Sequence, residues 1–241
     1  MKSKHTLWVG SRYRWRWMLV LSGFLAWCSI GCNPATFGFL FPEDTIQPEH
    51  KIFKGEKEYL FVGEKEVTVA VLCHFERPPL KQELAGADIE LADLVAQTLR
   101  RNAQDNKHKL KIVPASEIRG AFHKQLATGH VNKVELGKQF KADYVLEMSI
   151  GEMTLYEKNT YPAMFRGNTD IVVDLYDVNS KDVDRKIYTK DFRTQYPGTS
   201  GPIDAGTANP GQFRGVFLLR IAANISKLFI EYPRINKHVM D

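Results

Sequence analysis

The sequence predicts an α/β (α+β) domain in which amphipathic helices pack on a single mixed β-sheet. Segments with alternating apolar residues, typical of half-buried strands, are separated by segments whose apolar residues recur at three- and four-residue spacing, typical of helices. Their order is strand, helix, strand, helix, helix, three strands and helix. With 241 residues, the chain has room for one domain of ordinary size plus a leader and a linker. This order favours helices packed on one mixed sheet.

The first strand of the body is predicted at Glu66 to Phe75, after a short edge strand at residues 58–63. Alternation places Cys73 on the apolar face of this strand and His74 on the opposite face. A helix follows, which Asp88 can cap, and its inward stripe is Leu91, Leu94, Val95 and Leu99. We therefore expect Cys73 to be a buried small hydrophobic residue and not a reactive thiol.

The middle of the chain predicts a short strand at Leu110 to Val113 and two further helices. Pro114 and Ser116 open the first of these helices, and its inward residues are Ile118, Ala121 and Phe122. Asn132, with Glu135 three residues later, resembles a capping box at the start of the second. Residues 141–157 then alternate as a long strand.

The last part of the chain predicts a hairpin, a long loop and a final helix. The hairpin strands are residues 169–178 and 184–194, joined by turn-forming residues 179–182. A loop rich in glycine and proline leads to an amphipathic helix at residues 212–232, with these residues inward: Phe217, Ile221, Ile225, Leu228 and Phe229.

The charge is concentrated at the amino terminus. The net charge is +5, but residues 1–31 contain five of the 33 lysines and arginines and no acidic residue. The remaining 28 basic residues balance the 28 acidic residues, so the body is neutral. The overall charge therefore gives no reason to expect nucleic acid as a partner.

Residues 1–31 have the three parts of a secretory signal peptide: a basic start, an apolar run from Met18 to Ile30, and small residues before Cys32. Ile30, Gly31 and Cys32 resemble the lipobox of bacterial lipoproteins, although a leucine is usual where this chain has Ser29. The resemblance implies lipidation of Cys32 by diacylglycerol. The domain organisation predicted is a signal peptide (1–31), a lipidated tether (32–55) and a globular domain (56–241).

Two alternatives remain for this leader. The uncharged segment from Trp17 to Pro42 is long enough for a retained membrane span, although Pro34 lies in its middle, and simple cleavage is also compatible with the pattern. The basic residues before the run and Glu43 and Asp44 after it place the body outside the cytoplasm in every case. We therefore expect a membrane-anchored protein of the cell envelope, facing the periplasm.

No motif predicts catalysis or metal binding. Residues 206–211 have the glycine spacing of a phosphate-binding loop, but Gln212 and Phe213 stand where lysine and Ser/Thr are required. His123 and His130 are seven residues apart, and Ser200 lies outside any GxSxG motif. Two further sets are expected to be surface residues: the pair Glu147 and Glu152, and the aspartates of the hairpin (Asp170, Asp174, Asp177, Asp182 and Asp184). We expect no cofactor and no metal.

Two stretches resemble a known group of envelope proteins. GKQFKADYVLEMSIGEM, residues 137–153, resembles the helix-to-strand passage of the group that contains the curli secretion channel lipoprotein, the penicillin-binding-protein activators and the amino-terminal domain of the Tol translocation protein. DIVVDLYDVNSKDVDRKIYTKDF, residues 170–192, resembles the hairpin that follows in that group. The resemblance implies a non-enzymatic α/β domain that binds another envelope protein, and it transfers no site residue.

These observations together predict a membrane-tethered, non-enzymatic binding or assembly module. Its expected partners are the membrane, through the lipid on Cys32, and another envelope protein. Two other functions stay open: an envelope hydrolase whose site is built from residues distant in sequence, and a structural subunit of an oligomeric envelope complex.

Overall fold

A six-stranded mixed sheet forms the centre of the protein in the computed structural model, which describes residues 45–46, 48–49, 66–180 and 186–233. Its strand order is β3-β2-β4-β5-β6, and β7 pairs with β5 beyond the end of β6. The bounds are β2 (Val67–Phe75), β3 (Leu110–Val113), β4 (Tyr144–Tyr156), β5 (Met164–Asp177), β6 (Lys186–Tyr196) and β7 (Ile203–Asp204). Two short strands, β1 (Thr45–Ile46) and β8 (Tyr232–Pro233), form a separate antiparallel pair.

The sheet is parallel in one half and antiparallel in the other. β2 runs parallel to both β3 and β4, whereas β4, β5 and β6 are antiparallel neighbours. The parallel connections contain the helices, as such crossovers require, and the antiparallel strands follow one another directly along the chain. The predicted fold class and the predicted order of the main elements are confirmed.

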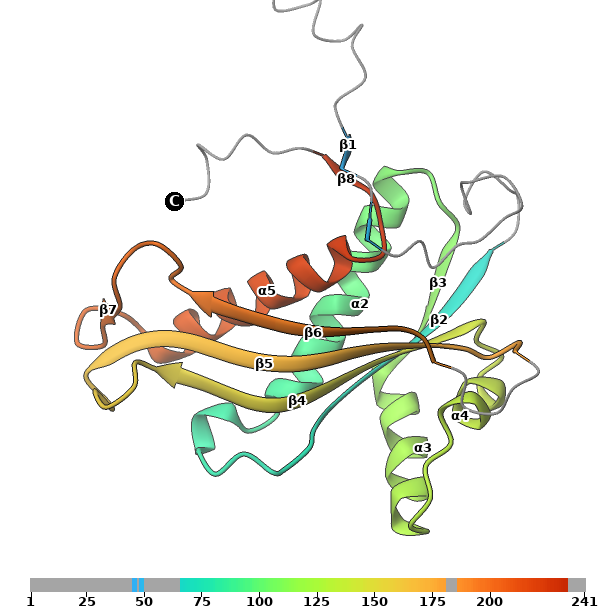
Figure 1. The fold of residues 1–241 in the computed structure, drawn as a ribbon, viewed down its shortest axis with the longest axis horizontal. Coiled ribbons are helices and arrows are strands. Elements are labelled where there is room, and N and C mark those ends of the chain that lie inside the picture. Colours follow the sequence, from blue (N-terminus) through green and yellow to red (C-terminus); the bar gives the residue numbers. More distant parts are fainter. Residues whose placement is uncertain (1–44, 47, 50–65, 181–185, 234–241) are drawn as a thin grey trace, which may run out of the picture. The chain divides into compact units, whose positions relative to one another are not determined.

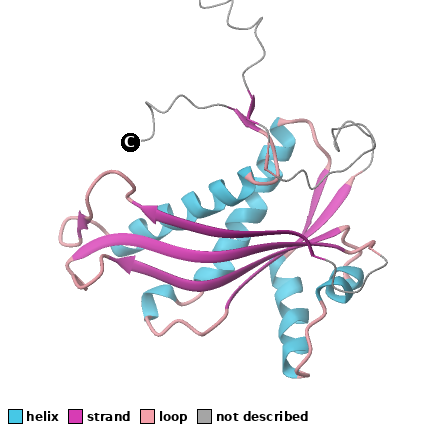
Figure 2. Cartoon of the chain, viewed as in Figure 1, coloured by secondary structure: helices cyan, strands magenta, loops and turns pink. Residues whose placement is uncertain are grey.

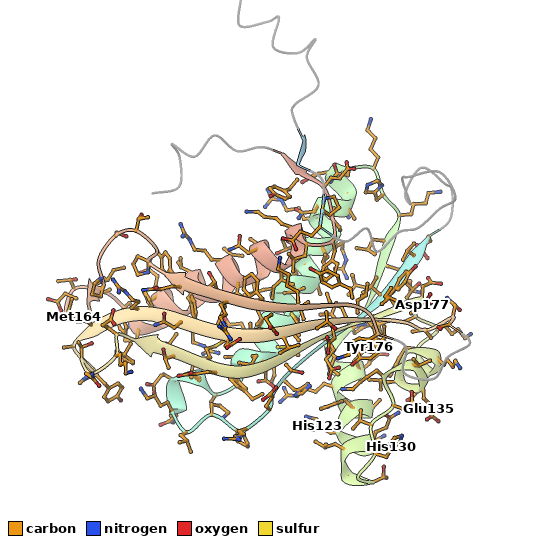
Figure 3. The ribbon with its side chains drawn as sticks, in the orientation of Figure 1. His123, His130, Glu135, Met164, Tyr176 and Asp177 are labelled. Carbon is orange, nitrogen blue, oxygen red and sulfur yellow. The ribbon has the colours of Figure 1, made fainter. Side chains whose placement is uncertain are left out.

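Four helices cover the sheet unequally (Figures 1 and 2). They are α2 (Ala87–Asp105), α3 (Ala115–Ala127), α4 (Lys133–Gln139) and α5 (Pro210–Lys227). On one face, α2 and α5 lie against the strands and bury the larger core cluster. On the other face, α3 and α4 form a smaller cluster with β2, β3 and the adjoining ends of β4 and β5. Figure 3 labels Met164 at the end of β5 far from α3 and α4, and Tyr176 and Asp177 at the end beside them.

Local sequence explains where two helices begin. The side chain of Asn132 accepts a hydrogen bond from the backbone N–H of Glu135 at 2.8 Å, so Asn132 caps α4 as predicted. Asn209 caps α5 in the same way, through the N–H of Gln212 at 3.0 Å, and Pro210 follows at the first helical position. The predicted inward residues of α3 and α5 are buried in the two clusters.

Several predicted boundaries were wrong. Asp88 does not cap α2: it lies in the first turn and forms an ion pair with Arg119 at 3.4 Å, while Gly86 precedes the helix in the left-handed conformation. Helix α5 ends at Lys227 and not at Tyr232; Tyr232 instead pairs with β1, in the extended geometry that the following Pro233 favours. Strand β5 begins at Met164 and not at residue 169, since its first residues pair with β4 and with β7.

Some predictions concern residues outside the described ranges: the leader (1–31), Cys32, the tether (32–55), the edge strand at 58–63, and part of the hairpin turn with Asp182 and Asp184. They stay predictions. Within the described ranges, none of the helices combines the length and the apolar character that a membrane span needs.

Candidate functional site

A buried polar cluster lies where α4 meets the sheet, and Glu147 is at its centre. Glu147 is on β4, and only 5% of its side chain is exposed. Its Oε1 accepts a hydrogen bond from His74 Nε2 at 2.9 Å and forms an ion pair with Lys133 of α4. Phe122 of α3 closes the cluster: its ring stacks on His74 at 4.9 Å between centroids, and Lys133 Nζ lies 4.8 Å from its centroid. The expectation that Glu147 is a surface residue was therefore wrong.

Burial and pairing act in opposite directions on Glu147. Burial alone disfavours the charged carboxylate and would raise its pKa. The hydrogen bond from His74 and the positive charge of Lys133 outweigh burial and lower the pKa of Glu147 to about 2. Glu147 is thus ionised at neutral pH and pairs with Lys133, whose side chain is 14% exposed.

The same cluster contains a serine, so its geometry bears on the hydrolase alternative. Ser149 Oγ lies 3.3 Å from His74 Nε2, the nitrogen that also contacts Glu147. In a Ser-His-Asp triad the serine and the carboxylate contact different nitrogens of the imidazole, so that the histidine can take the serine proton while the carboxylate orients it. Here both groups contact one nitrogen, while Nδ1 faces the carbonyl oxygen of Phe75 at 3.4 Å. The arrangement suits a structural hydrogen-bond network.

A second candidate site lies on the sheet face that α3 and α4 leave uncovered. We call the face of β4, β5 and β6 opposite α2 and α5, beyond α3 and α4, the open face. Its cross-strand neighbours form two polar rows, one of Glu152, Asp170 and Arg193 and the other of Thr154, Asn168 and Gln195. These rows and the adjacent β4–β5 connection line a hollow of 840 Å³. A volume of this size is within the ~300–1,000 Å³ of typical small-molecule sites.

Side chains within the hollow hold one another in place. Arg193 Nε donates to Asp170 Oδ2 at 3.1 Å, and Arg166 Nη1 forms an ion pair with Glu157 Oε2 at 2.8 Å. With its amide oriented to satisfy its neighbours, Gln195 accepts from Arg166 Nε at 3.0 Å and from Arg166 Nη1 at 3.1 Å. These contacts orient the planar groups of Arg166 and Gln195, whereas the Arg193–Asp170 pair is largely exposed to solvent.

Two tyrosines and a lysine form one wall of the hollow. Tyr156 and Tyr161 contact edge to face, with ring centroids 4.7 Å apart. Lys81, from the segment between β2 and α2, places its Nζ 4.4 Å from the centroid of Tyr161 and 5.5 Å from that of Tyr156. Tyr161 is nevertheless 60% exposed. Large aromatic side chains at this exposure are characteristic of contact surfaces.

The glycine-rich loop, Cys73 and Ser200 each occupy a position that the structure defines. Gly206, in the glycine-rich loop, donates its N–H group to Asp204, and Gln212, in the first turn of α5, donates its N–H group to Asn209, so both donors are already used. Cys73 is buried and burial raises the pKa of its thiol, which confirms its position on the apolar strand face. Ser200 is exposed on the loop after β6.

Of the acidic hairpin residues, Asp170 is on the open face as expected, but Asp174 is buried, where it accepts from Thr189 at 2.8 Å and pairs with Lys186. His123 lies on α3, and His130 lies beyond the end of that helix (Figure 3). In the part of the chain that the structure describes, no three His, Cys, Asp or Glu side chains are grouped in a way that would hold a metal ion.

Sequence reasoning missed the hollow. Lys81 and Tyr161 are 80 residues apart in predicted connections, which carry no periodic signal. The cross-strand rows depend on register: a bulge between Ile150 and Glu152 turns Glu152 onto the open face opposite Asp170. The alternation in residues 166–170 and 191–195 could have predicted polar residues on one face of two neighbouring strands. It could not have predicted which of these residues lie opposite one another.

No protein-family model matches the chain, and no curated protein sequence matches it. Similar solved structures include the PelC dodecamer from Paraburkholderia phytofirmans, at 10% identity over 78% of this chain and 97% of that chain, with a TM-score of 0.39. A hypothetical protein from Chlamydia trachomatis is 16% identical over 67% and 96% of the two chains, with a TM-score of 0.43. A lipoprotein from Neisseria meningitidis is 13% identical over 66% and 98%, with a TM-score of 0.40.

These similarities are partial likenesses of fold and transfer no function. The finer resemblance, to the group of the curli secretion channel and the Tol translocation protein, stays a prediction.

Proposed function

We propose that this chain is a membrane-tethered, non-enzymatic binding module of the bacterial cell envelope, anchored through lipid on Cys32. Its partner is another envelope protein, which adds a strand to the edge of β6. The observation that carries this proposal is the outer edge of that strand, of which Glu49 contacts the side chains of Tyr188 and Lys190. β6 is 11 residues long and ends the strand order, and among residues 45–46, 48–49, 66–180 and 186–233 no strand pairs with its outer side.

An edge strand presents backbone N–H and C=O groups that a second extended chain can pair with. Side chains of β6 alternate across the sheet: Thr189, Asp191, Arg193 and Gln195 are exposed on the open face. On the other face, Tyr188 packs against Phe229 at 5.5 Å between ring centroids and Phe192 joins the larger core. The strand is thus packed on one face, presents polar side chains on the open face, and has its backbone N–H and C=O groups along the outer edge.

The geometry of the Glu147 cluster supports the non-enzymatic part of the proposal. Its serine and carboxylate share one nitrogen of His74, and the other nitrogen faces a backbone carbonyl oxygen, so Glu147 does not orient the imidazole for proton transfer from Ser149 as the carboxylate of a triad does. Its contacts join α4, β2 and β4, which is the role expected of a buried ion pair that stabilises a specific packing.

The test is site-specific photo-crosslinking of the full-length chain in membranes. A photoreactive residue replaces Asp191 on β6 in one variant and Lys124, an exposed residue of α3, in the control variant. We expect a discrete adduct with another envelope protein from position 191 and none of the same mass from position 124. Mass spectrometry of the adduct should place the crosslinked peptide in an extended segment of the partner.

Equal adducts from both positions, or none from position 191, would refute strand addition at β6. An adduct of twice the chain mass would instead identify a second copy of this chain, and would favour the structural subunit of an oligomeric complex over the binding module.

A further inference from the structure

We propose that the hollow on the open face is a saccharide-binding site, which the chain has in addition to the strand-addition edge of β6. The inference rests on three features of one surface: a floor of two polar rows, a wall of two tyrosines, and contacts of Arg166 that orient part of the lining in advance. Sugar rings combine apolar C–H faces with closely spaced hydroxyl groups. The tyrosine wall matches the apolar faces, and the polar floor matches the hydroxyl groups.

The floor offers hydrogen-bonding groups in a regular arrangement. Adjacent strands lie about 4.8 Å apart, and alternate residues along a strand lie about 6.7 Å apart. The two rows therefore form a grid of six polar side chains: Glu152, Asp170, Arg193, Thr154, Asn168 and Gln195. The grid includes carboxylate, guanidinium, amide and hydroxyl groups, so each sugar hydroxyl can find both a donor and an acceptor.

The wall offers an aromatic surface. Tyr161 is 60% exposed, and both Tyr156 and Tyr161 line the hollow. The C–H face of a pyranose packs on such a ring, which removes apolar surface of both from water. Lys81, which lies over the two rings, draws the tyrosines together and adds a donor at the rim.

Part of the site is organised before binding. The contacts of Arg166 with Glu157 and Gln195 restrain long side chains that would otherwise lose rotamer freedom when a ligand binds. Arg193 uses its Nε for Asp170, and its guanidinium has further N–H groups.

Other ligand classes fit less well. A purely apolar ligand would remove the hydrogen bonds that the polar groups of the floor make to water and would provide no hydrogen bonds in their place. The lining contains four cationic side chains and three carboxylates, and two of the cations, Arg166 and Arg193, are already paired with Glu157 and Asp170, so a phosphate or other polyanion would have to compete with these carboxylates. A neutral saccharide avoids both costs.

The test is saturation-transfer difference NMR on the full-length protein, in a zwitterionic detergent without a sugar headgroup. The probes are chitotetraose, cellotetraose and maltotetraose, each titrated separately. We expect transfer to the ring protons of at least one probe. We expect Tyr161→Ala to weaken its binding at least tenfold and Tyr161→Phe, which keeps the stacking ring, to remain within threefold of the parent protein.

Two further variants complete the test. Asn168→Ala removes an amide of the floor and should also weaken binding. Tyr232→Ala is the matched control, because Tyr232 likewise lies under a lysine, with Lys227 Nζ 5.1 Å from its centroid, but outside the hollow; it should leave binding unchanged. Absence of transfer to all three probes, or equal binding by Tyr161→Ala and the parent protein, would overturn the proposal.

Discussion

The two halves of the sheet differ in how many of their faces are covered. β2 lies between α2 on one side and α3 on the other, and Val69, Ala70, Val71 and Leu72 are all at most 1% exposed. β6 is covered on one face, and its side chains alternate between half-buried and exposed. A parallel strand that is buried on both faces has a continuous apolar sequence, whereas an antiparallel strand that is buried on one face alternates between apolar and polar residues.

This difference separates stability from recognition. Both halves bury core residues against α2 and α5, and the first half also buries its second face under α3 and α4, whereas the open face contains the polar rows that a ligand or partner can reach. Substitutions in the first half should change the free energy of unfolding with no specific effect on binding. Substitutions on the open face should weaken binding with little change in the free energy of unfolding.

The largest expected effect is that of Leu72→Ala. Leu72 is 1% exposed and packs in the smaller core cluster, beneath α3 and α4, so truncation should lower the free energy of unfolding by about 2–5 kcal/mol. Val172→Ala is the control on the open face, where the side chain is only half-buried, and should cost less than about 1 kcal/mol. Urea unfolding measures both. Equal losses would contradict the proposed difference between the halves.

Glu147→Gln should alter the pH dependence of stability. The pKa of Glu147 is about 2 in the folded protein and 4.5 ordinarily, so its ionisation stabilises the fold fully above pH 4.5. This contribution, about 3 kcal/mol, is lost as the pH falls from 4.5 towards 2. Denaturant unfolding at several pH values should show the parent protein and the variant converging at low pH. A constant difference between them would rule out this linkage.

Gly167→Ala tests how closely α5 approaches β5. A Cβ added at Gly167 would lie 2.7 Å from the ring of Phe217, which is fully buried, so the ring must move. The expected cost is about 1–3 kcal/mol in the free energy of unfolding. Gly198→Ala is the matched control, because a Cβ there meets no atom within 4 Å. Thermal unfolding of the pair should show a lower melting temperature for Gly167→Ala alone.

The smallest expected effect on stability is that of Arg193→Gln. The Arg193 side chain is 76% exposed in its pair with Asp170, so solvent screens the interaction, and its loss should cost less than about 1 kcal/mol. Lys133→Gln, which breaks the buried pair with Glu147, should cost several times more. If the two variants unfold at the same denaturant concentration, burial does not distinguish the pairs.

The sequence was informative where periodicity reports burial. Cys73, Phe122 and Ile221 lie in the core as their spacing predicts, and Asn132 caps its helix. It was uninformative where contacts join distant segments. Glu147 looks like any strand carboxylate until His74 and Lys133 are placed beside it, and the hollow depends on a bulge and on two connections whose paths no local pattern determines.

The most direct test of the proposed function compares how much of the partner is recovered from membranes by the parent protein and by a variant with two reversed charges on β6. Asp191→Lys with Arg193→Glu changes two exposed side chains of β6 and leaves its core-facing residues intact. Reversal should place like charges opposite the partner's strand, which disfavours cross-strand pairing. We predict a melting temperature within a few degrees of the parent protein, about as expected for surface changes, and at least tenfold less of the partner recovered from membranes. Undiminished recovery by a folded double variant would contradict the proposal.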